Sequence, residues 1–456
     1  MRSVRLSLTV LLSVGLSLLA PLQAVPAAGA TTVVGRFPDG ATYRIDVPAG
    51  WNGTLALYSH GYTVNPLNPP QDAPDALTAG WLLDHGYALA GSSYATTGWA
   101  VEQAVPDQLQ VLDAFATLVG RPRRTIAWGH SLGGMITAAL VQLHPERFAG
   151  AMPMCGVLGG AVGAWNQALD AAFVFKTLLA PRSPLELVHV AHPLANTALA
   201  ASIATAAQLT AAGRARIALA AAMVDLPGWF DPAKPEPAPD AYLQQEANQY
   251  LWELDPDLFF SSDSRAEMER RAGGNPSWNT GVDYARQLQL STGRAEVEGL
   301  YAAAGLDLSA DLETLAAAPR ISADPDALAY LQRNVVFDGR LGGVPVLSVQ
   351  TVGDGLVPVD HERAYADVVA AAGDAGLLRQ LFVHRAGHCT FTPAETLAAF
   401  QALVGRLDTG GWQGLAPEAL NGAAVALGPA LNTAQPAYLA YQPPVFLREY
   451  DSRGGS

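Results

Sequence analysis

The residues best suited to chemistry in this chain of 456 residues surround a serine between two glycines. Residues 129–133 read GHSLG, which matches the pattern G-x-S-x-G with Ser131 at its centre. A short apolar run precedes the pentad and Leu132–His144 predicts a helix after it, so the serine falls in a strand–turn–helix connection. An ordinary Gly-containing turn gives the same string. In this setting, however, the turn exposes the hydroxyl and the helix N-terminus stabilises negative charge beside it, which makes Ser131 the candidate nucleophile.

A serine hydroxyl needs a general base, and histidine is the most common one. His388 lies in the loop after the last predicted strand, Leu377–Val383. His384 is the competing residue, but it lies at the end of the strand, where a surface or packed histidine is the simpler interpretation. We therefore expect His388 to take the proton of Ser131.

The base needs a carboxylate that orients its ring. Asp354 lies in a Gly-Asp-Gly loop after the predicted strand Val344–Thr351, and the order serine, acid, histidine is a known order for such sites. Asp360 is the alternative, but we expect it to cap the helix that begins at His361. Asp354 is the predicted acid.

Stabilisation of an oxyanion requires backbone donors close to the nucleophile. The segment SHGY at 59–62 follows an apolar strand, where one donor loop is expected. The backbone N–H of Tyr62, or of Gly61, together with that of Leu132 is the candidate pair. His60 is expected only to shape this turn.

The elements that must position these residues alternate between strands and helices. Apolar strands separated by helices predict a mostly parallel, doubly wound sheet covered on both faces, hence an α/β fold. The Asp-Gly pair at 39–40, between two alternating runs, predicts an N-terminal hairpin. We expect residues 31–158 and 343–407 to form two blocks of one sheet domain, 159–342 a mainly helical cap inserted between them, and 408–456 an irregular C-terminal tail.

Residues 1–30 are typical of a signal peptide. Arg2 and Arg5 precede the apolar run Leu6–Ala20, and the small residues Ala28-Gly29-Ala30 suit cleavage after Ala30. The alternative is an uncleaved anchor, although the run is shorter than the roughly 20 residues that span a bilayer. We expect a secreted protein, extracellular or periplasmic, with no stable membrane anchor after cleavage.

Composition narrows the possible partners. Half of the residues are hydrophobic and the formal net charge is −14, which excludes a disordered chain and gives no basic surface for nucleic acid. We find no cluster of metal ligands and no phosphate-binding loop, so no metal and no cofactor is implied.

These motifs together resemble the α/β-hydrolase superfamily, over roughly residues 50–155 and 344–405. They are His60-Gly61, the Gly129–Gly134 turn, the loop from Gly353-Asp354 to Val357-Pro358, and Gly387-His388. The resemblance implies a secreted bacterial-type serine esterase with a helical cap, acting on a small-molecule or polymeric ester without a cofactor. In this chemistry Ser131 attacks the carbonyl, His388 moves the proton and Asp354 orients His388.

The two cysteines resemble part of a pattern found in tannases and feruloyl esterases. Those enzymes pair a Cys after the catalytic His with a Cys just before the catalytic Ser. Cys389 matches the first position, but His130 occupies the second, so Cys155 would have to be a substitute partner. A Cys155–Cys389 disulfide and two free thiols both remain open.

Aromatic residues of the cap and of the loop after the strand Tyr87–Gly91 are candidates for the substrate pocket. They are Tyr94, Trp229 and Trp278. The competing interpretation is that each packs the cap against the core.

Ester hydrolysis is the leading functional hypothesis. A secreted serine peptidase of the same fold, of the capped aminopeptidase type, is the alternative. It needs cap carboxylates to bind a substrate ammonium, for which Glu246 or Glu253 is suitable. A binding protein with an inactive site is a third possibility, although every catalytic position is filled.

Overall fold

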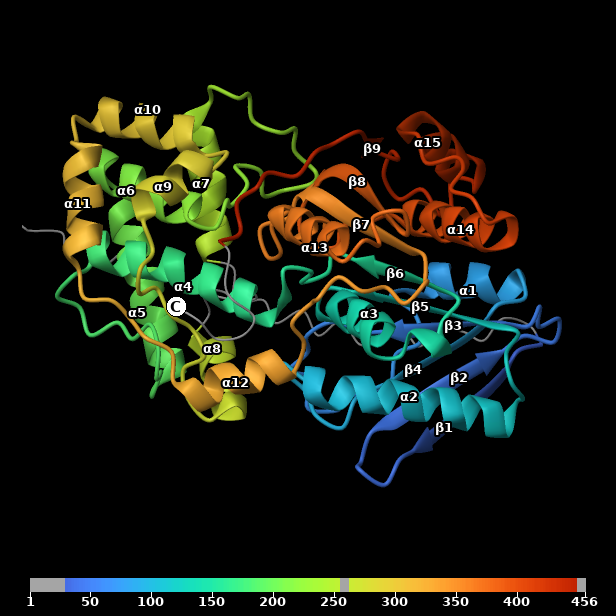
Figure 1. Cartoon of the computed structure of the whole chain (residues 1–456). Coiled ribbons are helices and arrows are strands. Elements are labelled where there is room, and N and C mark those ends of the chain that lie inside the picture. Colours follow the sequence, from blue (N-terminus) through green and yellow to red (C-terminus); the bar gives the residue numbers. More distant parts are fainter. Residues whose placement is uncertain (1–28, 255–261, 449–456) are drawn as a thin grey trace, which may run out of the picture.

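One mixed sheet runs through the half of the molecule that lies on the right in Figure 1. The computed structural model describes residues 29–254 and 262–448, and within them nine strands pair in the order β1-β2-β4-β3-β5-β6-β7-β8-β9. The strands are β1 (Thr31–Arg36), β2 (Thr42–Val47), β3 (Thr54–Ser59), β4 (Ala88–Ser92), β5 (Arg124–His130), β6 (Gly150–Met154), β7 (Val346–Gly353), β8 (Leu378–Ala386) and β9 (Tyr438–Leu439).

Strands β3 to β8 run parallel, whereas the two edges of the sheet are antiparallel. β1 and β2 form the expected hairpin, and Gly40 in its turn has φ +99°, a conformation that glycine adopts without strain. Every residue of β3, β4 and β6 is buried, as expected for strands with helices on both faces.

Helices cover the sheet on two faces, each with its own hydrophobic core. One core contains α2 (Val101–Leu118), α3 (Leu132–Leu143) and α13 (Asp360–Ala371), and the other contains α1 (Ala76–Asp84), α14 (Pro393–Thr409) and α15 (Pro417–Ala426). This is the α/β-hydrolase fold expected from the sequence, and the predicted fold class is confirmed.

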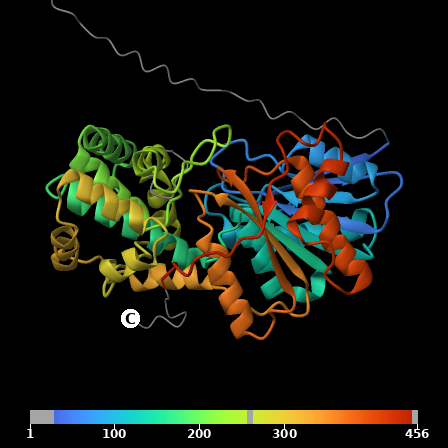
Figure 2. The same ribbon diagram turned by 90° about the horizontal axis from the view of Figure 1, so that it is seen from above.

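A helical cap lies beside the sheet (Figures 1 and 2). It leaves the core after β6 and returns before β7, and these two strands pair directly, with Ala151 opposite Val346. Its helices are α4 (Gly160–Leu179), α5 (Pro193–Gln208), α6 (Ala211–Ala222), α7 (Tyr242–Glu253), α8 (Ser262–Ala272), α9 (Tyr284–Leu290), α10 (Arg294–Ala304), α11 (Leu308–Ala317) and α12 (Pro325–Arg333).

Polar contacts attach the cap to the core. Glu267 on α8 accepts from the backbone N–H of Trp99 at 3.1 Å, and Arg271, one turn later, donates to Thr97 O and to Gln103 Oε1. A substituent on Gly98 would meet the Glu267 carboxylate at 2.4 Å, so the glycine permits this close approach. Helix α8 is therefore fixed over the loop that follows β4.

The segment 408–456 is not irregular throughout, contrary to expectation. α15 packs against the second core through Leu420, and β9 adds an antiparallel strand to β8. The Asn421 side chain both donates to Tyr438 O and accepts from Tyr438 N–H. The sequence pattern was weak because few residues of α15 are buried and most of the others are small.

The expected signal peptide falls almost entirely outside the described residues, since only its last two residues, 29 and 30, are among them. In the parts of the chain that the structure describes, no helix combines the length and apolar character needed to cross a bilayer.

Candidate active site

Ser131 occupies a sharp turn between β5 and α3. Its φ of 59° and ψ of −125° are uncommon for a residue with a side chain, and its N–H donates to Met154 O at 3.0 Å. The glycines around it allow close packing, because a Cβ on Gly133 would lie 1.9 Å from Ser59 O. The turn therefore needs glycine where the sequence has it, and it presents the serine at the carboxyl edge of the sheet.

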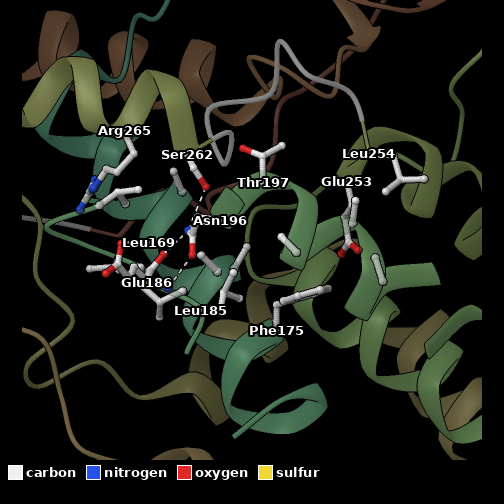
Figure 3. A pocket seen from close by; sticks show the side chains of 18 of the residues that line it. Leu169, Phe175, Leu185, Glu186, Asn196, Thr197, Glu253, Leu254, Ser262 and Arg265 are labelled. Atoms are coloured by element: carbon white, nitrogen blue, oxygen red, sulfur yellow. Dashed lines mark hydrogen bonds between the residues drawn. The ribbon is translucent and has the colours of Figure 1, made fainter. Parts of the chain in front are cut away.

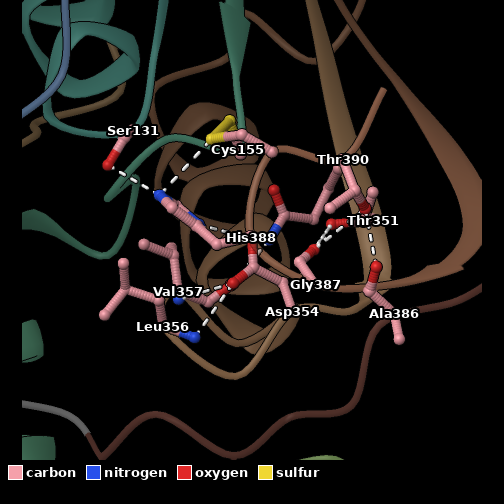
Figure 4. Close-up of a disulfide and its surroundings, with 12 residues drawn as sticks. Ser131, Cys155, Thr351, Asp354, Leu356, Val357, Ala386, Gly387, His388 and Thr390 are labelled. Atoms are coloured by element: carbon pink, nitrogen blue, oxygen red, sulfur yellow. Dashed lines mark hydrogen bonds and ion pairs between the residues drawn. A yellow bond between two sulfur atoms is a disulfide. The ribbon is translucent and has the colours of Figure 1, made fainter. Parts of the chain in front are cut away.

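Ser131, His388 and Asp354 form a continuous chain of hydrogen bonds (Figure 4). His388 Nε2 lies 2.8 Å from Ser131 Oγ, and His388 Nδ1 lies 2.8 Å from Asp354 Oδ2. The Asp354 side chain is fully buried, whereas that of His388 is 18% exposed. This arrangement suits a serine whose proton passes to a ring held by a carboxylate.

Backbone donors hold the Asp354 carboxylate in place. Its Oδ1 accepts from the N–H groups of Leu356 and Val357 at 3.0 and 2.9 Å. Gln350 donates from Nε2 to Val357 O at 2.6 Å and lies 3.4 Å from Asp354 Oδ2. Sequence reasoning missed Gln350, although a glutamine within an otherwise apolar strand was the signal that could have found it.

The competing residues lie elsewhere. His384 is exposed and pairs with Glu236 at 2.7 Å. Asp360 does not cap α13 as expected; it is the first residue of that helix, and its Oδ2 accepts from Gln167 Nε2 at 3.0 Å. Burial and the charge of Asp225 raise the pKa of Asp360 well above its usual value. Asp360 therefore bonds to helix α4 of the cap and does not cap its own helix.

Cys155 and Cys389 form a disulfide beside the histidine (Figure 4). Cys389 directly follows His388, and its Sγ lies 3.3 Å from His388 Nε2. Cys155 follows β6, and its N–H donates to Val349 O. The disulfide alternative is therefore the one observed, and the two free thiols are excluded.

The loop after β3 lies against the nucleophile. A Cβ on Gly61 would lie 3.2 Å from Ser131 Cβ and 3.7 Å from its Oγ. Leu132 is the first residue of α3, so its N–H has no partner within the helix. The N–H groups of Leu132 and of Gly61 or Tyr62 thus come from the two segments that flank Ser131.

Tyr94 packs against the loop that follows β3. Its hydroxyl donates to His60 O at 3.0 Å, and its ring stacks on that of His60 with centroids 4.0 Å apart. The Tyr94 side chain is 1% exposed, so it does not line an open pocket as expected. Instead, it fixes the backbone just before Gly61.

His130, next to the nucleophile, is held in its neutral form. Burial and the nearby His388 lower the pKa of His130 to about 3. Its ring packs among Tyr58, Trp128 and Phe391. These contacts make His130 a packing residue at the base of the turn.

The two cap tryptophans proposed for the pocket make structural contacts instead. Trp229 donates from Nε1 to Asp231 O and Lys234 O, and its ring contacts His384. Trp278 lies beneath the guanidinium of Arg448, 5.4 Å from the ring centroid.

Trp252 contacts the catalytic loop more directly. Its Nε1 donates to Trp229 O at 3.1 Å, and a Cβ on Gly355, the residue after Asp354, would lie 2.4 Å from its ring. Trp252 is one of several cap aromatics that the sequence offers for a pocket, and nothing in the sequence shows which of them faces that loop.

One group of side chains among the described residues has the spacing of metal ligands. It consists of Cys155, His388 and Cys389. Its two sulfur atoms are bonded to each other, so the disulfide accounts for their proximity.

Comparison with known proteins identifies a relative of nearly the same length. The o-phthalyl amidase of Xanthobacter agilis is 31% identical over 431 residues, which cover 87% of this chain and 91% of the amidase. The chain belongs to the family of this amidase. A model of the prolyl oligopeptidase family also matches residues 86–161, a stretch that includes the Ser131 turn.

Solved structures give weaker similarity. An esterase of Aspergillus oryzae has a TM-score of 0.41 at 14% identity, covering 84% of this chain and 79% of the esterase. Feruloyl esterase B of the same organism has a TM-score of 0.39 at 14% identity, covering 83% and 80%. The family membership, the fold and the site together describe a serine hydrolase of the α/β-hydrolase fold.

Proposed function

We propose that this protein hydrolyses carboxylic esters through an acyl-enzyme on Ser131, with His388 as base and Asp354 as orienting acid. The observation that carries the proposal is the unbroken hydrogen-bond chain from Ser131 Oγ through both ring nitrogens of His388 to Asp354 Oδ2.

Acylation begins when Ser131 Oγ attacks the substrate carbonyl carbon and its proton moves to His388 Nε2. The N–H groups of Leu132 and of Gly61 or Tyr62 donate to the oxyanion. Asp354 stabilises the imidazolium through Nδ1–H. The tetrahedral intermediate collapses as His388 gives its proton to the leaving group, which leaves an ester on Ser131.

Deacylation repeats these steps with water. His388 takes a proton from the water, whose oxygen attacks the acyl carbon, and then returns a proton to Ser131 Oγ. The acid product departs and the free serine is restored. In both half-reactions only Ser131 and His388 exchange protons with the substrate or water, while Asp354 and the backbone N–H groups act through hydrogen bonds.

Amide hydrolysis is the second candidate, and the 31% identical amidase favours it. The same groups can cleave both bonds, but a departing amine must be protonated by His388 as it leaves, whereas many alcohols depart more readily. Of the two carboxylates proposed to bind a peptide's ammonium, Glu246 is fully buried in the cap. Its Oε2 is 3.3 Å from Gln208 Nε2, a contact that suits cap structure better than substrate binding.

A substrate panel distinguishes the two. It compares p-nitrophenyl esters of increasing acyl length, amino-acid p-nitroanilides, and anilides of o-phthalic and benzoic acids. Ser131→Ala should lower kcat by about 10⁴–10⁶-fold on every substrate that is turned over. His388→Ala should do nearly the same, whereas His384→Ala is the matched control and should retain activity.

Retention of ester turnover in Ser131→Ala would contradict the mechanism. Turnover of amides without any turnover of activated esters would contradict the ester proposal and leave an amidase. A burst of p-nitrophenol, equal to the enzyme concentration, is expected wherever deacylation limits the rate.

We also propose that the protein is secreted after cleavage behind Ala30. The sequence of residues 1–30 supports this, and a disulfide suits an oxidising compartment. Expression of the full chain in a secreting bacterial host should yield a mature protein that begins at Thr31. An intact N-terminus in the cell pellet would contradict the proposal.

A further inference from the structure

A cavity of about 160 Å³ lies inside the cap (Figure 3). It is lined by α4, α5, α6, α7, α8 and the segment between α4 and α5, and neither Ser131 nor His388 nor Asp354 lines it. All of the described residues that line the cavity therefore belong to the cap.

Small side chains create the space. Alanines of α4, α5 and α6 line much of it, and Leu169, Phe175 and Leu185 complete an apolar wall. An engineered apolar cavity of similar size, about 150 Å³, holds a benzene molecule. This cavity can therefore hold one aromatic ring or an alkyl group of that size.

Two oxygen atoms on this wall lack a partner among the described residues. They are Glu253 Oε2 on α7 and Thr197 Oγ1 on α5, both shielded from solvent. Leaving such atoms unpaired is costly, which favours a ligand with hydrogen-bond donors. Burial and the charge of Glu246 raise the pKa of Glu253, so the ionised form of this carboxyl group is disfavoured unless a cation lies beside it.

The other polar groups around the cavity are already paired. Arg265 donates to Glu269, Ser277 and Asn275. Asn196 bonds to the backbone of Glu186 and to Ser262 (Figure 3). The unpaired carboxylate oxygen is therefore the charged group available to a ligand.

We propose that the cap cavity is a second, non-catalytic binding site for a small apolar amine, whose ammonium donates to Glu253 and Thr197. The ligand's ring or alkyl group fills the alanine-lined space. A carboxylate of the same shape should not bind, because the arginine in the cavity wall, Arg265, is already paired with Glu269 and cannot balance a buried negative charge. This site does not depend on the proposed reaction at Ser131.

The test is calorimetric titration of the full chain carrying Ser131→Ala with benzylamine, and with phenylacetate and benzyl alcohol as matched ligands. Benzylamine should bind with a Kd of about 1 mM or tighter, and phenylacetate should not bind. Glu253→Gln should weaken benzylamine binding about tenfold or more. Glu298→Gln, at an exposed position on α10 that does not line the cavity, is the control and should change it less than about threefold.

Ala201→Leu fills the cavity and should abolish binding while circular dichroism and Tm show a folded protein. Absence of benzylamine binding up to 10 mM (roughly the weakest useful affinity for a fragment) would overturn the proposal. Equal binding by the Glu253→Gln and Ala201→Leu variants would also overturn it, because the amine would then occupy another site. Equal affinity for benzyl alcohol would leave an apolar site and remove the role assigned to charge.

Discussion

Cys389 is covalently bonded to Cys155, so the residue after His388 is joined to the end of β6, 234 positions earlier in the chain. The bond connects the base to the strand that follows the nucleophile helix. His388 is thus held from both sides, by Asp354 through its ring and by the disulfide through its backbone.

Removal of the disulfide should impair both stability and catalysis. The Cys155→Ser/Cys389→Ser variant should lose about 2–5 kcal/mol of unfolding free energy, because the closed loop is long. Its kcat should fall more than its KM rises, since the loop that carries His388 is less constrained. Reductant should reproduce both effects in the parent protein and do nothing further to the variant. A variant with unchanged kcat would show that the bond only stabilises the fold.

Asp354→Asn should preserve the shape of the site and lower kcat by about 10⁴-fold, because an amide cannot stabilise the imidazolium. Asp360→Asn is the matched control. Asp360 is buried, burial and the charge of Asp225 raise its pKa, and its side chain accepts a hydrogen bond from Gln167 and not from His388, so an amide should replace it with little loss of kcat. Steady-state kinetics on one p-nitrophenyl ester measures kcat for both variants. A similar loss of kcat in the two would contradict the assignment of Asp354 as the acid.

Tyr94→Phe should lower kcat by a few-fold to about tenfold with little change in KM. The substitution removes the hydrogen bond to His60 O, which is worth about 1 kcal/mol, while the stacked ring remains. The loop before Gly61 then holds its donor N–H groups less firmly. A change in Tm without any change in kcat would reduce Tyr94 to a packing residue. Tyr87→Phe, on the other face of the sheet, is the control.

Trp252→Ala should loosen the contact between the cap and the Asp354 loop. The ring packs against Gly355 and is 4% exposed, so its loss leaves a cavity and destabilises the protein by about 3–5 kcal/mol. Trp252→Phe should keep most of that packing and restore most of the activity. If Trp252→Ala retains full activity at a temperature where it is folded, the cap does not support the acid loop.

The cap should be more stable at mildly acidic than at alkaline pH. Burial raises the pKa of Glu246 to about 7, and burial with the nearby Glu246 charge raises that of Glu296 to about 8. Between their ordinary pKa near 4.5 and about pH 8, the unfolded chain loses these protons while the native protein keeps them. Stability therefore falls as pH rises through this window.

Thermal melts from pH 5 to pH 9 measure this effect. The Glu246→Gln/Glu296→Gln variant should show a smaller decline in Tm than the parent protein. Some decline should remain, because burial also raises the pKa of Glu362 to about 7. Parallel curves for variant and parent would contradict the role given to the two cap carboxylates.

The fold could be predicted from the sequence because the patterns that indicate it lie within short segments of the chain. Apolar strands alternating with helices predict a parallel sheet, and glycines at 129 and 133 are required by the close approach of β3 to the turn. The positions of Ser131, Asp354 and His388 follow from the same logic, since each lies just after a strand of that sheet. These three residues lie close together because the strands that precede them are near one another in the sheet.

Contacts between segments that are far apart in the chain could not be predicted, because no local sequence pattern indicates them. Trp229 and Trp278 looked like pocket residues by type, but the ring of Trp229 packs against His384 and that of Trp278 against Arg448, both far away in the chain. Asp360 looked like a helix cap, but its partner is Gln167, 193 positions away in the cap. Helix α15 is likewise held by a contact that the sequence does not indicate, the hydrogen bond from Asn421 to Tyr438 O.

The insertion of the cap between β6 and β7 also determines when the enzyme can become active. A ribosome completes Ser131 first and His388 only 257 residues later, which takes roughly 10–50 s at ordinary rates of synthesis. During that interval the serine has neither its base nor its acid, and the sheet lacks the strands that bring them. The proposed catalytic site is therefore incomplete in a nascent or truncated chain, and the hydrolysis proposed for it can start only in a nearly finished molecule.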